Sequence, residues 1–140
     1  MRALILLCFL PLCYCLFRRM QTVGVKGKFL CNREPATGVR IKLYDKGIFI
    51  DTMLDEVGLD NTGSFKISGS AKLWIKMNPR LDIYHRCDYK GACYKKFTME
   101  IPKAYIADGE KVKQYFDIHS LELTWKRKGE TEDCNNGWNR

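Results

Sequence analysis

Strict alternation of apolar and polar residues is the feature that most constrains how this chain folds. The alternation recurs in seven short stretches, at residues 22–31, 39–44, 64–68, 72–77, 81–86, 96–101 and 116–125. Successive side chains of a β-strand point to opposite faces, so each stretch predicts a strand with one face toward a core and the other toward solvent. Seven or eight short strands at this spacing predict an all-β, immunoglobulin-like sandwich.

Turn-forming residues separate these stretches. Residues 60–63, Asp-Asn-Thr-Gly, predict a tight hairpin turn in which Gly63 takes a positive φ. Residues 102–109 offer the one place for a short helix, of about two turns. An acidic stretch near the turn is predicted as a solvated edge rather than a calcium site, because its spacing does not match an EF-hand loop. Its members are Asp51, Asp55, Glu56 and Asp60.

The first twenty residues decide the cellular compartment. An uncharged run of 15 residues lies between Arg2 and Arg18. This layout is typical of a secretory signal peptide, whereas a membrane-spanning helix needs about 20 apolar residues. The predicted organisation is a signal peptide over 1–15, cut after Cys15 and no later than residue 20, a soluble extracellular domain over 21–134 and a polar tail over 135–140.

Four cysteines remain after the predicted signal peptide: Cys31, Cys87, Cys93 and Cys134. An even number in a short secreted chain predicts two disulfides, and the paired spacings of a zinc site are absent. Four cysteines allow three pairings. Since Cys87 and Cys93 bracket a loop between two predicted strands, we expect them to bond to each other, which leaves Cys31–Cys134 by elimination.

The charge of the chain narrows the class of partner. The formal net charge is +8, and removal of residues 1–15 takes away only Arg2, leaving +7. A basic secreted protein is expected to bind an anionic lipid surface, a polyanionic glycan or an acidic protein rather than nucleic acid. The alternative is that the charge only keeps the protein soluble. If the strands that carry Lys26 and Lys28 and those that carry Arg40 and Lys42 are neighbours, these four cations form one stripe.

Residues 84–96 form the most informative cluster. They combine tyrosines, cations and one histidine: Tyr84, His85, Arg86, Tyr89, Lys90, Tyr94, Lys95 and Lys96. Cations suit anionic headgroups, and tyrosine rings suit the polar boundary of a membrane. We therefore predict that this hairpin contacts an anionic membrane surface or a cell-surface receptor. The alternative is an ordinary hairpin with a solvated tip.

Catalysis is not predicted, and neither is a cofactor or a metal. His85 falls on the apolar face of its strand beside Cys87, which indicates a half-buried structural histidine. Asp117 and His119 share one strand face, but Ser120 points the opposite way, so the three residues do not form a triad on one strand. The nucleophile and metalloprotease motifs are absent.

Several segments in order resemble the nematode transthyretin-like family. They run from residue 22 to residue 134: 25–32 (VKGKFLCN), 39–45 (VRIKLYD), 54–56 (LDE), 63–65 (GSF), 68–69 (SG), 81–87 (LDIYHRC), 93–97 (CYKKF), 101–102 (IP), 116–118 (FDI) and 129–134 (GETEDC). The resemblance implies a secreted transthyretin-like sandwich. The related urate-pathway hydrolase ends in Tyr-Arg-Gly-Ser and uses histidines, and this chain has neither that ending nor a histidine in its first strand.

The resemblance leaves two functional hypotheses. Some members of the family resemble extracellular bridging molecules that recognise phosphatidylserine on dying cells and a receptor on the engulfing cell, which implies an adaptor. The vertebrate hormone carrier of the wider superfamily implies instead a carrier of a small hydrophobic ligand. A carrier needs an enclosed apolar cavity or an oligomeric channel, whereas an adaptor needs only exposed patches.

Overall fold

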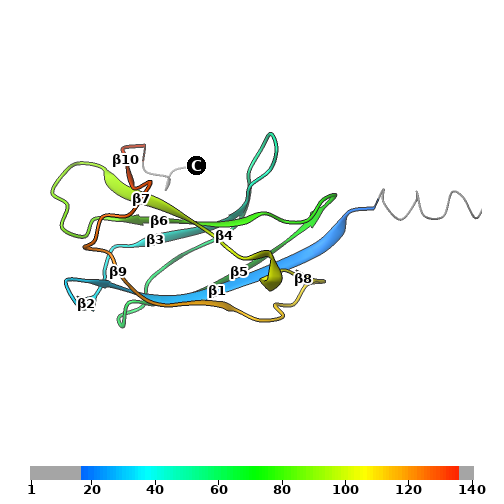
Figure 1. Ribbon diagram of the computed structural model, residues 1–140, viewed down its shortest axis with the longest axis horizontal. Coiled ribbons are helices and arrows are strands. Elements are labelled where there is room, and N and C mark those ends of the chain that lie inside the picture. The colour runs from blue at the N-terminus through cyan, green and yellow to red at the C-terminus, as the bar shows by residue number, and fades with distance from the viewer. Residues whose placement is uncertain (1–16, 136–140) are drawn as a thin grey trace, which may run out of the picture.

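The computed structural model describes residues 17–135, which form two β-sheets packed face to face (Figure 1). Seven strands have six or more residues: β1 (Arg19–Cys31), β3 (Arg40–Asp45), β4 (Thr52–Gly58), β5 (Ser64–Leu73), β6 (Pro79–His85), β7 (Tyr94–Glu100) and β9 (Phe116–Glu122). Three are shorter: β2 (Glu34–Pro35), β8 (Ala107–Asp108) and β10 (Thr131–Asp133). The predicted all-β sandwich is confirmed.

The two sheets divide the chain unevenly. Sheet A is built around the 13-residue strand β1. This strand pairs antiparallel with β2, β5 and β8 and parallel with β9. Sheet B has the order β10-β7-β6-β3-β4. Consecutive strands therefore often lie in different sheets, and several connections cross from one sheet to the other at the ends of the sandwich.

The core lies between the two sheets and follows the alternation of the sequence. Val23, Val25 and Phe29 of β1 face Ile41, Leu43, Leu81 and Ile83 of sheet B, and all seven are fully buried. The rings of Phe29 and Phe65 stack with centroids 5.3 Å apart. Burying one such side chain stabilises the fold by about 1.5–3 kcal/mol relative to leaving it exposed.

Strand β4 was not predicted, because it is an edge strand whose residues are mostly exposed on both faces. An edge strand of this kind has no apolar face and therefore no alternation to detect. The acidic residues assigned to a solvated edge do lie on or beside it: the Glu56 carboxylate is 3.8 Å from Arg40, and Asp55 accepts a bond from the Glu56 amide.

Two further predictions are wrong. The strand predicted at 72–77 ends at Leu73, and residues 74–78 cross from sheet A to sheet B. Gln21 holds this crossing, because its amide donates to the Ile75 carbonyl (2.8 Å) and accepts from the Met77 amide (2.7 Å). The predicted helix at 102–109 is only a 3₁₀ turn, Lys103–Tyr105, since the chain resumes strand pairing at Ala107.

The turn at residues 60–63 and its positive φ at Gly63, 80°, are confirmed, but the predicted hairpin is wrong. The Asp60 carboxylate accepts bonds from the Thr62 hydroxyl and from the amides of Thr62 and Ser64. These bonds, that of the hydroxyl foremost, lower the pKa of Asp60. The turn joins β4 of sheet B to β5 of sheet A, so it closes an edge of the sandwich instead of a hairpin within one sheet.

The sandwich has two ends that differ in content (Figure 1). The disulfide end comprises the end of β1, the connection 86–93 and the segment 123–134. The Trp74 end comprises the start of β1, the β3–β4 loop at 46–51 and the crossing 74–78. Within residues 17–135, no helix has the length and apolar character needed to span a membrane. The predicted signal peptide and most of the predicted tail lie outside the described residues.

Candidate functional site

The disulfide end contains all four cysteines, but their pairing differs from the prediction. Cys31 bonds to Cys87, and Cys93 bonds to Cys134. The predicted pairs Cys87–Cys93 and Cys31–Cys134 are therefore wrong. Cys31 follows Phe29 on the core-facing side of β1, and Cys87 follows Ile83 and His85 on the core-facing side of β6. Because the two strands belong to facing sheets, this bridge ties sheet A to sheet B.

The second bridge depends on a strand that the sequence did not reveal. β10 pairs antiparallel with β7, and Asp133 lies opposite Tyr94. The next pair outward in this register is Cys134 and Cys93, whose Cα atoms are 4.3 Å apart. The bridge therefore fastens the last strand to sheet B.

Arg86 lies within the connection 86–93 and holds it together. Its guanidinium donates to the carbonyls of Gly91 and Cys93, the latter at 2.7 Å. The same group lies 5.6 Å from the ring centre of Tyr89 and 5.5 Å from that of Tyr94. Three predicted contact residues, Arg86, Tyr89 and Tyr94, are thus brought together, but they contact one another and the backbone of their own segment.

Tyr84 and Lys96 lie on the outer face of sheet B, and both contact side chains of the same sheet. Tyr84 is buried, with the ammonium groups of Lys42 and Lys96 at 5.2 and 5.5 Å from its ring centre. Burial raises the pKa of Tyr84. Burial lowers the pKa of Lys96, but the Asp82 carboxylate 3.6 Å away, Tyr84 and Asp133 together outweigh this effect, so the pKa is raised. Lys96 is therefore bound within the sheet.

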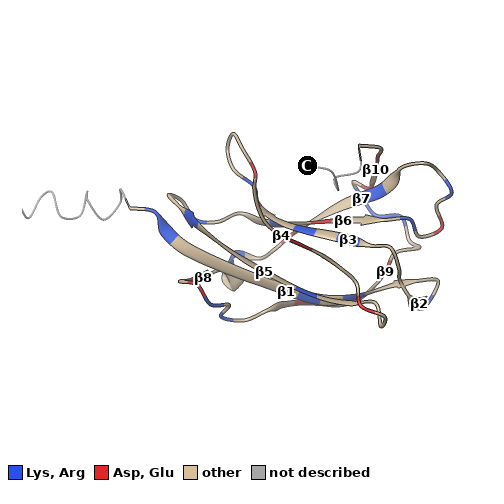
Figure 2. Cartoon of the chain, turned by 180° about the vertical axis from the view of Figure 1, so that it is seen from behind, with Lys and Arg blue, Asp and Glu red and all other residues tan. Residues whose placement is uncertain are grey.

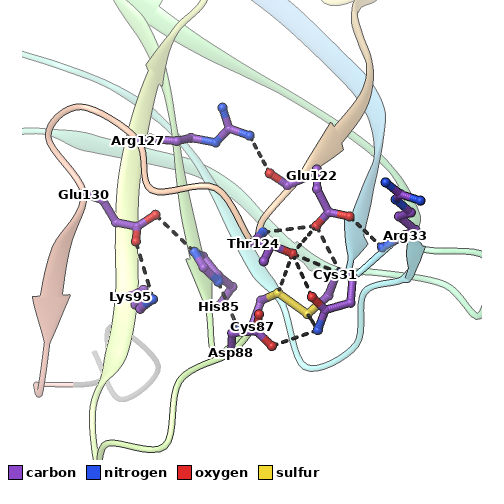
Figure 3. Close-up of a disulfide and its surroundings, with 11 residues drawn as sticks. Cys31, Arg33, His85, Cys87, Asp88, Lys95, Glu122, Thr124, Arg127 and Glu130 are labelled. Atoms are coloured by element: carbon purple, nitrogen blue, oxygen red, sulfur yellow. Dashed lines mark hydrogen bonds and ion pairs between the residues drawn. A yellow bond between two sulfur atoms is a disulfide. The ribbon is translucent and has the colours of Figure 1, made fainter.

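Lys95 and His85 share a buried carboxylate, that of Glu130 (Figure 3). Glu130 lies 3.9 Å from the Lys95 ammonium and 3.5 Å from Nε2 of His85, which is fully buried. The Cys87 amide donates to Nδ1 of His85 at 3.2 Å, so the ring proton of the neutral form lies on Nε2 and points to Glu130. Burial lowers the pKa of His85, and Glu130 offsets this in part.

Glu122 accepts a dense set of hydrogen bonds, and no sequence pattern singled it out. Its carboxylate accepts from the amides of Asn32 (3.2 Å), Arg33 (2.6 Å) and Thr124 (3.1 Å) and from the Thr124 hydroxyl (2.6 Å), as Figure 3 shows. These bonds, the Thr124 hydroxyl foremost, lower the pKa of Glu122 to about 2. Asn32 and Arg33 have φ of 53° and 67°, so their turn forms an anion-binding nest. An internal carboxylate already fills it.

The residues weighed for catalysis and metal binding are dispersed. The His119 ring is exposed, with Nδ1 3.6 Å from the Asp117 carboxylate. The only cluster of metal-binding groups in residues 17–135 consists of Cys31, Cys87 and Asp88, and both of its sulfurs are in the disulfide.

The chain is similar in sequence to a known family of proteins. The model of the TTR-52 transthyretin-like family matches residues 26–102. Three proteins of Caenorhabditis elegans are similar along most of their length: transthyretin-like protein 5 (39% identity, 96% of this chain and 99% of that protein), transthyretin-like protein 33 (33%, 81% and 82%) and transthyretin-like protein 2 (32%, 84% and 85%). The chain belongs to the transthyretin-like family. The resemblance seen in the sequence is confirmed.

The predicted cationic stripe of this transthyretin-like protein has a different composition. Arg40 and Lys42 lie on β3 of sheet B, so they cannot extend the row of Lys26 and Lys28 on β1 of sheet A. The register places Lys66 of β5 directly opposite Lys26, and Ser64 opposite Lys28. The outer face of sheet A thus carries three neighbouring lysines, Lys26, Lys28 and Lys66. Figure 2 shows blue segments, which mark Lys and Arg, along β1.

A tyrosine lies among these lysines. A Cβ at Gly24 would come within 2.6 Å of the Tyr115 ring, so glycine lets this ring lie directly on β1. The Lys66 ammonium is 4.3 Å from the centre of the same ring. Two acids lie near them: Asp117 is beside Lys26 in the register and also accepts the His119 amide, and Asp60 interacts electrostatically with Lys28. We call Lys26, Lys28, Lys66 and Tyr115 the sheet A patch.

The hollows of this transthyretin-like chain lie at its surface. One of about 480 Å³ adjoins the Cys31–Cys87 bridge and is lined by Ala36, Asp88, Tyr94 and Leu123 among others. Another of about 390 Å³ lies at the Trp74 end, between Arg19, Trp74 and Ile106. The space between the sheets is filled by the core side chains, so these hollows favour surface contacts over an enclosed ligand.

Proposed function

We propose that this protein is a secreted, non-catalytic binding protein that attaches to an anionic surface, such as a phosphatidylserine-bearing membrane. The observation that carries the proposal is the charge of the two long strands of sheet A. β1 and β5 contain five cations and no acid: Arg19, Lys26, Lys28, Lys66 and Lys72. Every other strand, in sheet A as in sheet B, contains at least one acid. Pairing of all four described cysteines is in keeping with secretion.

The fold relieves the repulsion among the lysines of the sheet A patch only in part, through Asp117 beside Lys26 and the Tyr115 ring beside Lys66. Like charges directly opposite each other on neighbouring strands, as Lys26 and Lys66 are, destabilise a sheet by up to roughly 1 kcal/mol. An anionic surface removes this repulsion, and each lysine near it contributes about 1 kcal/mol of attraction. Three lysines therefore supply only weak attachment on their own, and firm binding requires several molecules or a second contact.

The hairpin at 84–96 contributes less to this attachment than its composition predicts. Lys95 and Lys96 face Glu130 and Asp82, and Arg86 is bound to its own loop. Lys90 is exposed, and no ion pair is recorded for it in the described part of the chain. In this proposal, Lys90 and the adjacent Tyr89 are the residues of the hairpin that contact an anionic membrane or a receptor.

Vesicle sedimentation of the secreted protein tests the proposal. We expect binding to vesicles with phosphatidylserine, little binding to neutral phosphatidylcholine, and loss of binding as salt shortens the Debye length to about 8 Å and below. K26Q/K66Q should weaken binding several-fold, and K90Q should weaken it less. K126Q/K128Q removes the same charge from exposed sites after β9 and is the matched control. Equal losses in K26Q/K66Q and K126Q/K128Q would contradict a specific patch.

A further inference from the structure

Exposed apolar side chains gather at the Trp74 end. Eight large apolar side chains are exposed in residues 17–135. Five of them belong to this end, Ile48, Phe49, Ile50, Trp74 and Ile75, and two more adjoin it in sequence, Phe17 before β1 and Met53 in β4. Phe49 is 95% exposed, Ile48 79% and Ile50 77%, on the tip of one loop. Trp125 is the exception and follows β9 at the disulfide end. Scattered exposed apolar residues are ordinary, but a contiguous set marks an interaction site.

The two segments that carry these side chains are held next to each other through backbone bonds. The Lys46 amide donates to the Asn78 carbonyl (2.9 Å), and the Asn78 amide donates to the Asp45 carboxylate (2.7 Å). Gln21 binds the crossing from the other side. The backbone is therefore tied to the fold, while the apolar side chains at 48–50 and 74–75 point away from it.

Cations surround these apolar side chains. Arg18, Lys46, Lys72 and Lys76 are exposed at this end, and the Arg18 guanidinium lies 5.2 Å from the centre of the Trp74 ring. Asp51, Asp108 and Glu110 are exposed acids of the adjoining segments, and the Gly109 amide next to Glu110 donates to the Met20 carbonyl. Tryptophan and long cationic side chains with apolar neighbours are typical of the boundary between lipid tails and headgroups.

We infer that the Trp74 end inserts into a bilayer with anionic headgroups, with Ile48, Phe49, Ile50, Trp74 and Ile75 entering the boundary of the acyl chains. The cations beside them would then meet the headgroup phosphates and carboxylates. A second copy of the chain is a poorer occupant, because two such ends brought together would oppose cation to cation. This insertion goes beyond the proposed function, since it uses another surface and an apolar contact that salt does not weaken.

Trp74 itself reports insertion. The sequence has three tryptophans, so W125F/W138F leaves Trp74 as the sole emitter. With this variant collected from culture medium, we expect a blue shift of the emission on phosphatidylserine-containing vesicles and quenching by brominated acyl chains. W74F/W138F, in which Trp125 alone emits, should be quenched little. Adding I48S/F49S/I50S to the Trp74 reporter should lower the fraction bound roughly tenfold.

The outcomes separate this inference from the proposed function. Vesicle binding with an unquenched Trp74, or with Trp125 quenched instead, overturns insertion and leaves the sheet A patch standing. Quenching of Trp74 that persists in about 0.5 M salt and in K26Q/K66Q supports insertion and contradicts the patch. Absence of vesicle binding at any salt concentration overturns insertion, as does a concentration-dependent dimer that I48S/F49S/I50S abolishes.

Discussion

The two ends of this sandwich differ in how far their side chains are engaged by the rest of the chain. At the disulfide end, the guanidinium of Arg86, the carboxylates of Glu122 and Glu130 and the imidazole of His85 all contact groups of the same chain. At the Trp74 end, Phe49 and its neighbours point away from the fold. A cluster of cations and tyrosines in sequence therefore does not by itself identify a free surface, since the fold decides which of those groups are already bound.

Removing the bridge between the sheets should have the largest effect. In the chain-entropy model, C31A/C87A loses about 4 kcal/mol of unfolding free energy, because the bridge closes a loop with a sequence separation of 56. Denaturant unfolding under non-reducing conditions measures this loss. If C31A/C87A has the same denaturant midpoint as the parent, this bridge does not hold the groups at the disulfide end. The two ends then differ less in how firmly the fold holds them.

Acid should destabilise the fold through His85. An unfolded histidine has its ordinary pKa of 6.5, and burial lowers the pKa of His85 in the folded protein. Below about pH 6.5 the unfolded chain therefore takes up a proton that the folded chain refuses, and the unfolding free energy falls as the pH falls. Urea unfolding between pH 7.5 and 5.5 should show a smaller decrease for H85Q than for the parent. H119Q changes an exposed ring and is the control; an equal slope in H85Q and the parent refutes the assignment.

The smallest effect is expected at the Trp74 end. Phe49 is 95% exposed, so F49S should change the unfolding free energy by no more than about 0.5 kcal/mol. The buried F29A is the matched comparison and should cost about 3–5 kcal/mol, since it removes a ring stacked on Phe65. Thermal and denaturant unfolding of both variants measures the difference. A large loss in F49S would mean that this loop packs on the protein and is not available to a bilayer.

The sandwich could be predicted from sequence because its core strands alternate. Leu81, Ile83 and His85 share a face in the sequence and share the core in the structure. β4 and β10 escaped prediction, because edge strands with polar residues on both faces carry no period. The disulfides were mispaired for the same reason, since β10 is what brings Cys134 to Cys93.

The candidate surfaces could be predicted only in part. Lys26 and Lys28 were placed on one face correctly, but which strand lies beside them is a long-range property, and Lys66 came from 40 positions along the chain. The partners of Lys95 and Lys96 are likewise remote or cross-strand residues. The apolar tip at 48–50 carries no alternation, and only exposure in the folded chain distinguishes it from a core segment.

Gln21 gives the Trp74 end an unusual freedom to evolve. The crossing is bound through the carbonyl of Ile75 and the amides of Met77 and Asn78, that is, through atoms every residue type except proline supplies. The side chains of Trp74, Ile75 and Lys76 take no part in these bonds. Mutation at these three positions can therefore change the chemistry of this surface while leaving those bonds in place, as in an antibody loop on a constant framework.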